Sequence, residues 1–527
     1  MFDFSKMANA ELFLSHADFY QTTRSFKEIL NGSYRVELLY GLSLLSFVHD
    51  EEKRFRHWAL ATLCKSQRQR ERAVDRAVYS RLQCWRMWSL IFNEWETNAD
   101  GESRLGTEVL HEAFALLNDR KDDVKDDAQQ ALVKAITSQS RDNPISKLRR
   151  AQHIFLDSES LKPFIKAFEQ RIGVPLKMYV NVVFYLVQYW HDMRYGKKTM
   201  PSFEDWAMTA EWLSKQIHTS VDQVKLILKD ISFSADEGRA FAKSTENQPN
   251  EFMLYRERPL FEIMEGVYVP VEGKLVEELL FENLLYRIHK ANGQCEEFLS
   301  LFGDEFEKYA QQYAIDFMQG LPKYEVIEEF VFGSKKKRIH SPDLIISIPE
   351  KSALAVFEMK SARPLYKSLS AENTPESLED SVEKLYGVPL KQAYTAVQNI
   401  LKQKAHSSFG EHSKYTLISV TMNNFPMTFM EYNVDDGSGN NMSSGLHSFD
   451  IETFEVLMQA ARYTTKYNIL DMLLWSYQQR HLMSTKTFLK RLIDDMCAEG
   501  LSPGLVLTKM RDATLKRHQS YFHSFAI

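Results

Sequence analysis

The chain has 527 residues, of which 44% are hydrophobic and 26% charged, as is usual for a globular protein. Glycine (20) and proline (15) are together about half as frequent as in an average protein. This scarcity excludes collagen-like, low-complexity and β-propeller chains and favours helices. The formal charge of −6 gives no overall reason to expect a nucleic acid partner.

The cysteines and apolar segments exclude several further classes. No CxxC pair is present, which argues against a structural zinc site or a disulfide framework and favours a reducing, cytoplasmic setting. The N-terminus lacks the basic start and apolar run of a signal peptide, so we expect none. The most apolar stretches, 38–48 and 178–190, are too short to span a bilayer, so we expect no membrane association.

Residues 1–250 are predicted to be almost entirely helical, because apolar residues recur at helical spacing, as in Leu12, Phe19 and Phe26. The clearest break is SQSRDNPIS at 138–146, where two helical subdomains could meet. We expect four crowded tryptophans to anchor a helical core: Trp58, Trp85, Trp88 and Trp95.

From residue 252 the pattern changes to a mixture of strands and helices. A β-hairpin over LFEIMEGVYVPVEG and a helix over 274–290 precede a helix over 296–317. Strands are then predicted at 324–332, 339–348, 353–360 and 415–422, with a helix at 384–404, a basic turn at 333–338 and loops at 370–383 and 435–445. We therefore expect an α+β or α/β multidomain protein: a helical region at 1–250, a mixed-sheet domain at 251–462 and a helical segment at 463–527.

The segment Ser341–Arg363 carries the residues with catalytic chemistry. Asp343 opens one apolar strand after Pro342, and Glu358 stands near the end of the next, two residues before Lys360. Side chains alternate along a strand, so Glu358 and Lys360 share a face and Met359 lies opposite. Pairing of the two strands as a hairpin would bring Asp343 near Glu358. Two such carboxylates suit Mg²⁺ or Mn²⁺, which can activate a water and stabilise a phosphoryl transition state.

These residues resemble the PD-(D/E)xK nuclease superfamily, which has the restriction-endonuclease-like fold. Pro342-Asp343 matches the first half of its motif and Glu358-Met359-Lys360 the second, and the surrounding order of elements at 252–460 is similar. The resemblance implies a metal held by Asp343, Glu358 and the backbone carbonyl of Met359, with Lys360 positioning the attacking water. It also implies a supporting acid on the preceding helix, for which Glu307 is preferred over Glu305.

The resemblance extends less completely to the helix after Lys360. Some branches of the superfamily carry a functional glutamine there, and this chain offers Gln392 and Gln398. The QxxxY pattern of the RecB-like branch is absent, because Ala396 follows Gln392 by four residues. Gln392 stays a candidate for contact with the substrate. His340 could touch phosphate or serve only in a turn.

Positive charge gathers around this segment despite the negative total. Residues 333–367 hold eight basic and three acidic residues, and residues 53–90 hold ten and two. We expect nucleic acid contacts from Arg363, Gln392 and the basic turn Lys335, Lys336, Lys337 and Arg338. The segment 53–90 could equally be a solvated helix face or an interface with an acidic protein. No phosphate-binding GxxxxGK[ST] loop is present, so no ATPase motor is expected.

The resemblance therefore implies a Mg²⁺-dependent or Mn²⁺-dependent nuclease that hydrolyses phosphodiester bonds of DNA, a metal-binding and DNA-binding endonuclease, which we expect to be cytoplasmic. A nuclease with a large helical appendage suggests a prokaryotic antiviral defence or restriction-type effector, with a homodimer or a defence partner protein as its assembly. Two alternatives stay open: a non-catalytic nucleic-acid-binding or protein-binding scaffold on a degenerate nuclease fold, and a nuclease that acts on RNA.

Overall fold

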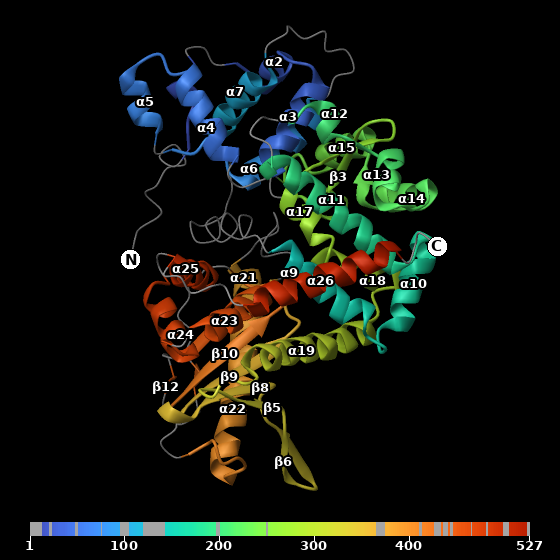
Figure 1. The fold of residues 1–527 in the computed structure, drawn as a ribbon. Coiled ribbons are helices and arrows are strands. Elements are labelled where there is room, and N and C mark those ends of the chain that lie inside the picture. Colours follow the sequence, from blue (N-terminus) through green and yellow to red (C-terminus); the bar gives the residue numbers. More distant parts are fainter. Residues whose placement is uncertain are drawn as a thin grey trace. The chain divides into compact units, whose positions relative to one another are not determined.

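The computed structural model describes most of the chain as helices and strands (Figure 1). The described residues are 13–20, 24–47, 51–74, 76–94, 105–119, 143–196, 201–248, 251–364, 375–410, 414–425, 434–435, 441–442, 446–464, 466–480, 483–498 and 505–523. The chain forms two compact units. The helical unit comprises Met1–Ala151, Phe164–Gly293 and Arg517–Ile527, and the sheet unit comprises Gln152–Pro163 and Gln294–Lys516.

The helical unit follows the predicted periodicity. Its helices are α2 (Phe26–Leu30), α3 (Arg35–Phe47), α4 (Glu51–Thr62), α5 (Gln67–Ala73), α6 (Arg81–Asn93), α7 (Gly106–Asp119), α9 (Pro144–Arg150), α10 (Lys162–Ile172), α11 (Leu176–Gly196), α12 (Phe203–Trp206), α13 (Ala210–Ile217), α14 (Val221–Ile231), α15 (Ala235–Ser244), α16 (Met253–Glu257), α17 (Gly273–Glu278) and α18 (Glu282–Ala291). A capping box of Ser80 and Gln83 begins α6.

Two of the four tryptophans are confirmed as core residues. Trp85 and Trp88, on α6, are buried, and the Trp88 indole donates a hydrogen bond to the backbone oxygen of Val271 at 3.1 Å. Trp58 is only half-buried, and Trp95 lies outside the described residues. The predicted break at 138–146 is described only from residue 143, where Asn143 caps α9.

A small sheet belongs to the helical unit and moves the boundary between the units away from the predicted one. The expected hairpin forms β3 (Leu260–Met264) and β4 (Val267–Pro270), which lie between β2 (Ser232–Phe233) and β1 (Met208–Thr209) in the order β1-β4-β3-β2. Because the hairpin pairs with strands of the helical region, the division falls at 293–294 instead of residue 251. Two-residue strands carry no periodicity that sequence inspection could detect.

The sheet unit is built on five strands in the order β13-β10-β9-β8-β5. Its strands are β5 (Glu325–Glu328), β8 (Leu344–Ile348), β9 (Ala353–Lys360), β10 (Lys414–Thr421) and β13 (Leu446–Asp450). β5, β8 and β9 pair antiparallel, whereas β9, β10 and β13 run parallel, so the sheet is mixed as predicted. All but the last residue of β9 are buried, which explains its continuous apolar sequence.

Helices precede, separate and follow the strands of this sheet in the sequence. They are α19 (Glu296–Met318), the short turn η4 (Pro349–Lys351), α21 (Pro375–Val382), the π-helical turn η5 (Glu383–Gly387), α22 (Val388–Gln403), α23 (Ile451–Tyr463), α24 (Ile469–Gln478), α25 (Thr485–Ala498) and α26 (Leu505–His523). The part of α26 from Arg517 onward belongs to the helical unit. Within the described part of the chain, no helix is both long enough and apolar enough to cross a membrane.

Several predicted bounds are corrected by the structure. The strand expected at 324–332 divides into β5 and β6 (Val331–Ser334), and that at 339–348 into β7 (Lys337–His340) and β8. Among the described strands, β6 and β7 pair with each other and with no other strand, so the alternating pattern continues although the chain has left the main sheet. The loop expected at 370–383 is helical from Pro375, and that at 435–445 contains the paired strands β11 (Val434–Asp435) and β12 (Asn441–Met442); the rest of both lies outside the described residues.

Candidate functional site

Asp343 and Glu358 meet at one end of the neighbouring strands β8 and β9, inside the five-stranded sheet. β8 and β9 pair with Leu344 opposite Phe357, so the next position brings Asp343 opposite Glu358. Both side chains are largely buried, each residue being 8% exposed. The Asp343 carboxylate accepts a hydrogen bond from the backbone N–H of Met359 at 2.6 Å, which fixes it across the strand pair. The predicted hairpin convergence is thus confirmed.

Lys360 lies on the same face of β9 as Glu358, while Met359 is fully buried on the other face. The ammonium nitrogen of Lys360 is 2.9 Å from Oε1 of Glu358, 3.8 Å from Oδ2 of Asp343 and 3.7 Å from Oε1 of Glu307. Three carboxylates therefore converge on one ammonium group. We call these four residues the carboxylate cluster.

The structure distinguishes the two candidate acids on α19. Glu307 faces Lys360, whereas Glu305 accepts a hydrogen bond from the Ser160 hydroxyl at 3.0 Å and pairs with Lys308 at 2.8 Å. Residues two apart on a helix point in different directions, so only one of the pair can reach the cluster. The buried face of α19, which includes Phe302, Phe306 and Tyr309, sets the rotation that selects Glu307.

Burial and mutual repulsion perturb the acids of the cluster. Burial, with the neighbouring Asp343 charge, raises the pKa of Glu358 and that of Glu307 to about 7 each. Burial also raises the pKa of Asp343, although Lys360 and the Met359 amide oppose the rise. Burial disfavours the charged form of Lys360, but the carboxylates of Glu358 and Asp343 outweigh it and raise the Lys360 pKa. Lys360 therefore stays protonated at neutral pH.

The donor set fits a hard divalent cation. Three carboxylates against one ammonium leave an excess of two negative charges when all are ionised, and the raised pKa values show that this excess is costly. Among the residues that the structure describes, no three His, Cys, Asp or Glu side chains form a ready-made metal cage. Mg²⁺ commonly takes one or two carboxylates and completes its shell with water and phosphate oxygens, so Asp343 and Glu358 are the residues that could hold it.

A further positioning residue escaped sequence inspection. The Gln311 side-chain amide donates a hydrogen bond to the backbone oxygen of Asp343 at 2.8 Å and so ties α19 to the start of β8. Gln311 follows Glu307 by four residues, which places both on one helix face. That spacing was the available signal. The predicted ligand role of the Met359 carbonyl stays a prediction.

The predicted basic turn lies on a two-stranded ribbon, which we define as β6, β7 and their turn. Lys335, Lys336, Lys337 and Arg338 are all exposed. At the base of the ribbon, the backbone N–H of Ser341 donates a hydrogen bond to the backbone oxygen of Phe330 at 2.9 Å. The Ser341 hydroxyl oxygen accepts a hydrogen bond from the backbone N–H of Phe330, also at 2.9 Å. Asp343 follows two residues later, so the ribbon base adjoins the carboxylate cluster in sequence.

The remaining candidates lie around this region without joining the cluster. His340 pairs with Glu329 at 2.5 Å, as a residue of the ribbon base. Gln392 is exposed on α22 and lines an open hollow with Ile339 and His340. Gln398 donates to the Tyr415 hydroxyl at 3.0 Å. Arg363 is half-buried near Lys384, whose pKa is lowered by burial and by Arg363.

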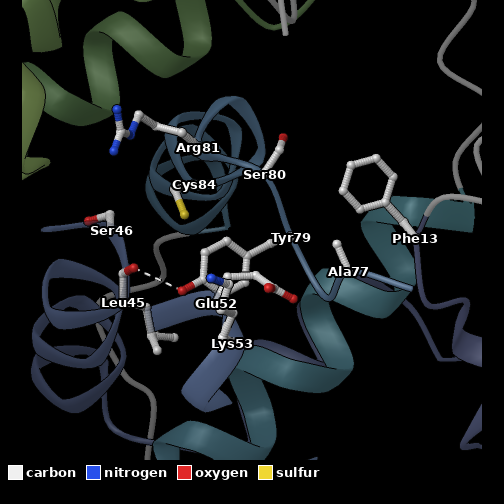
Figure 2. A pocket seen from close by; sticks show the side chains of 10 residues that line it. All are labelled: Phe13, Leu45, Ser46, Glu52, Lys53, Ala77, Tyr79, Ser80, Arg81 and Cys84. Atoms are coloured by element: carbon white, nitrogen blue, oxygen red, sulfur yellow. Dashed lines mark hydrogen bonds between the residues drawn. The ribbon is translucent and has the colours of Figure 1, made fainter. Parts of the chain in front are cut away.

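A second hollow, of about 220 Å³, lies in the helical unit (Figure 2). Two of its polar side chains are bonded within the protein: the Tyr79 hydroxyl donates a hydrogen bond to the Leu45 backbone oxygen at 2.8 Å, and Arg81 forms an ion pair with the buried Glu272 at 2.8 Å. Burial raises the pKa of the Cys84 thiol well above its usual value, so the thiol stays protonated. Part of the basic segment 53–90 is thus neutralised by internal ion pairs.

Comparison of the chain with protein-family models, with curated proteins and with solved structures gave no match.

Proposed function

We propose that the carboxylate cluster is the active site of a metal-dependent nuclease that hydrolyses phosphodiester bonds, most readily those of DNA. The observation that supports this proposal is the convergence of Asp343, Glu358 and Glu307 on Lys360 at one end of β8 and β9. A structural ion pair would need one carboxylate for one ammonium, whereas a phosphodiesterase site needs excess negative charge for a cation and a cation for phosphate.

In this proposal each residue has a separate task. Asp343 and Glu358 would hold a divalent cation, which polarises the phosphate and acidifies a bound water. Lys360 stays protonated and therefore acts as a hydrogen-bond donor to the water or to a phosphate oxygen, and it cannot act as a base. Glu307 is the least buried of the three acids, and its pKa of about 7 suits a group that accepts a proton near neutral pH.

The chemical step then balances. A water oxygen forms a bond to phosphorus, its proton passes to Glu307, the bond from phosphorus to the leaving oxygen breaks, and that oxygen takes a proton from solvent.

The cytoplasmic location, the assembly as a dimer or with a partner protein and the role in antiviral defence stay predictions.

The test is cleavage of nucleic acids by the purified full-length protein. Plasmid DNA, linear DNA and RNA are incubated with Mg²⁺ or Mn²⁺, beside the Asp343→Ala and Lys360→Ala variants. We expect DNA to be cut by the parent in a metal-dependent manner and by neither variant. Equal cleavage by parent and variants would show that a contaminant or another site is responsible.

A further inference from the structure

The exposed charges of the ribbon formed by β6 and β7 have no carboxylate partner in the part of the chain that the structure describes. Among the described residues, Lys335, Lys336, Lys337 and Arg338 make no ion pair with any carboxylate. By contrast, the chain pairs many of its other cations, as in Lys351 with Asp471 at 3.0 Å. Four adjacent unpaired cations repel one another, so the ribbon tip is suited to a polyanion.

The ribbon also stands apart from the main sheet. β6 and β7 form a sheet of two strands, and most of their residues are exposed, including Val331 at 52%. Figure 1 shows this ribbon extending beyond the five-stranded sheet of its own unit. An isolated two-stranded ribbon is only marginally stable in water, which favours a role that a bound partner completes.

The dimensions of the ribbon suit a groove of B-form DNA. Four residues per strand give a length of about 13 Å, and the two strands lie about 4.8 Å apart. The major groove of B-DNA is about 12 Å wide and 8.5 Å deep and admits a two-stranded ribbon, whereas the deep, narrow major groove of A-form RNA does not.

We propose that the β6–β7 ribbon enters the major groove of duplex DNA next to the carboxylate cluster, with its lysines on the flanking phosphates. The inference deepens the proposed function, since it names duplex DNA as the substrate of that site and assigns the ribbon to holding it. The ribbon base is three residues from Asp343, so a duplex held there has its backbone beside the cluster.

Charge and shape of the ribbon can be changed separately. A Cβ atom at Gly333, where φ is +97°, would lie 2.5 Å from the backbone oxygen of Lys337. Gly333→Val therefore distorts the ribbon and leaves all four cations in place. The triple variant Lys335→Ser, Lys336→Ser, Lys337→Ser removes charge and leaves the glycine. A matched control, Lys402→Ser, Lys404→Ser, Lys414→Ser, removes three exposed lysines that lie at the end of α22 and the start of β10.

The test is equilibrium binding of full-length protein, by fluorescence anisotropy, to a 30-bp (about three-turn) DNA duplex, its single strand and the matching RNA duplex. Asp343→Asn serves as the background so that the DNA stays intact. Each phosphate contact contributes about 0.9 to the logarithmic salt slope, so the triple variant should lose up to about 2.7, equal to a roughly 40-fold difference between 50 and 200 mM salt. Gly333→Val should also weaken duplex binding. The control should change neither the affinity for the duplex nor the salt slope.

Several results would overturn the inference: an unchanged salt slope in the triple variant, equal losses in the control, full binding by Gly333→Val, or equal binding of duplex RNA or single strands. Failure of the proposed function looks different. If the parent cuts nothing but binds duplex DNA through the ribbon, the nuclease proposal fails and the ribbon proposal stands. If it cuts DNA and the ribbon variants bind normally, the reverse holds.

Discussion

Lys360 and the three acids around it show how strand geometry brings charged residues together in a cluster. The hairpin register places Asp343 opposite Glu358, and alternation along β9 turns Glu358 and Lys360 to one side. This part of the site could be predicted, because both rules are local. The choice of Glu307 over Glu305 could not be secured, because it depends on the rotation of α19 and on Ser160, which is 145 residues away in sequence.

The two α19 acids provide a matched pair for mutagenesis. We expect Glu307→Gln to lower the single-turnover rate of DNA cleavage by about 10²–10⁴-fold, the usual contribution of a side chain that accepts a proton in the reaction. Glu305→Gln should leave the rate within about twofold, because Glu305 bonds to Ser160 and Lys308 instead. Rates that fall equally in both variants would remove Glu307 from the site.

The raised pKa values of Glu307 and Glu358 predict that protons compete with a divalent cation. Each acid has a pKa of about 7, above its usual 4.5, so both are largely protonated at pH 6 and ionised at pH 8. Metal binding requires the ionised forms and should release protons. Calorimetric titration with Mg²⁺ should show tighter binding at pH 8 than at pH 6, with heats that depend on the buffer. Affinity independent of pH would contradict this.

The raised pKa values of Glu307 and Glu358 also affect how the stability of the metal-free protein depends on pH. A group whose folded pKa is raised contributes stability at low pH that is lost as the pH rises through the folded value. Burial lowers the pKa of His111, His447 and His518, which acts in the opposite direction, so the comparison is between the parent and Glu358→Gln. Relative to Glu358→Gln, the metal-free parent should lose melting temperature between pH 5.5 and pH 8, and Mg²⁺ should restore more of the loss in the parent than in Glu358→Gln.

At the scale of elements, β9 is the strand on which the site depends. Its sequence predicted its bounds, because a nearly continuous apolar run marks a strand buried on both faces. The separation of β6 and β7 from the main sheet was not predictable, since period-two alternation reports the pleat of a strand and not its neighbours. The helical α21 was obscured by an acidic composition that also suits a loop.

Shortening a buried side chain of β9 should lower the stability of the sheet unit. Phe357 is fully buried, and its ring contacts that of Phe454 with centroids 5.5 Å apart. Phe357→Ala should lower the free energy of unfolding of the sheet unit by about 3–5 kcal/mol, measured by urea denaturation. Val388→Ala, at a residue 45% exposed on α22, is the control and should change it by less than about 0.5 kcal/mol. Equal effects would mean that β9 is not central to the core.

At the scale of the whole molecule, the chain is interleaved between its two units. The segment Gln152–Pro163 belongs to the sheet unit although the residues on both sides of it belong to the helical unit. Its Phe155 ring stacks on Phe302 of α19 with centroids 5.7 Å apart. The sequence predicted contiguous domains, because periodicity assigns an element type and says nothing of which core a short segment joins.

This interleaving predicts the behaviour of fragments. A fragment that begins at residue 294 lacks the segment that covers Phe302, so its melting temperature should lie below that of the sheet unit in the full chain. A synthetic peptide of residues 152–163 should raise the temperature, and a scrambled peptide should not. An unaffected fragment would show that the segment adds little to the core.

The charge total of −6 averages an exposed basic ribbon beside the carboxylate cluster with a more acidic remainder.

The central claim is that the carboxylate cluster hydrolyses DNA. The most direct measurement is the Mg²⁺-dependent cleavage rate of one duplex by the parent, Asp343→Asn and Glu305→Gln under identical conditions. We predict a loss on the order of 10²–10³-fold or more in Asp343→Asn and a near-parental rate in Glu305→Gln. Cleavage by Asp343→Asn at the parental rate, or none by the parent with any divalent metal, would contradict the claim.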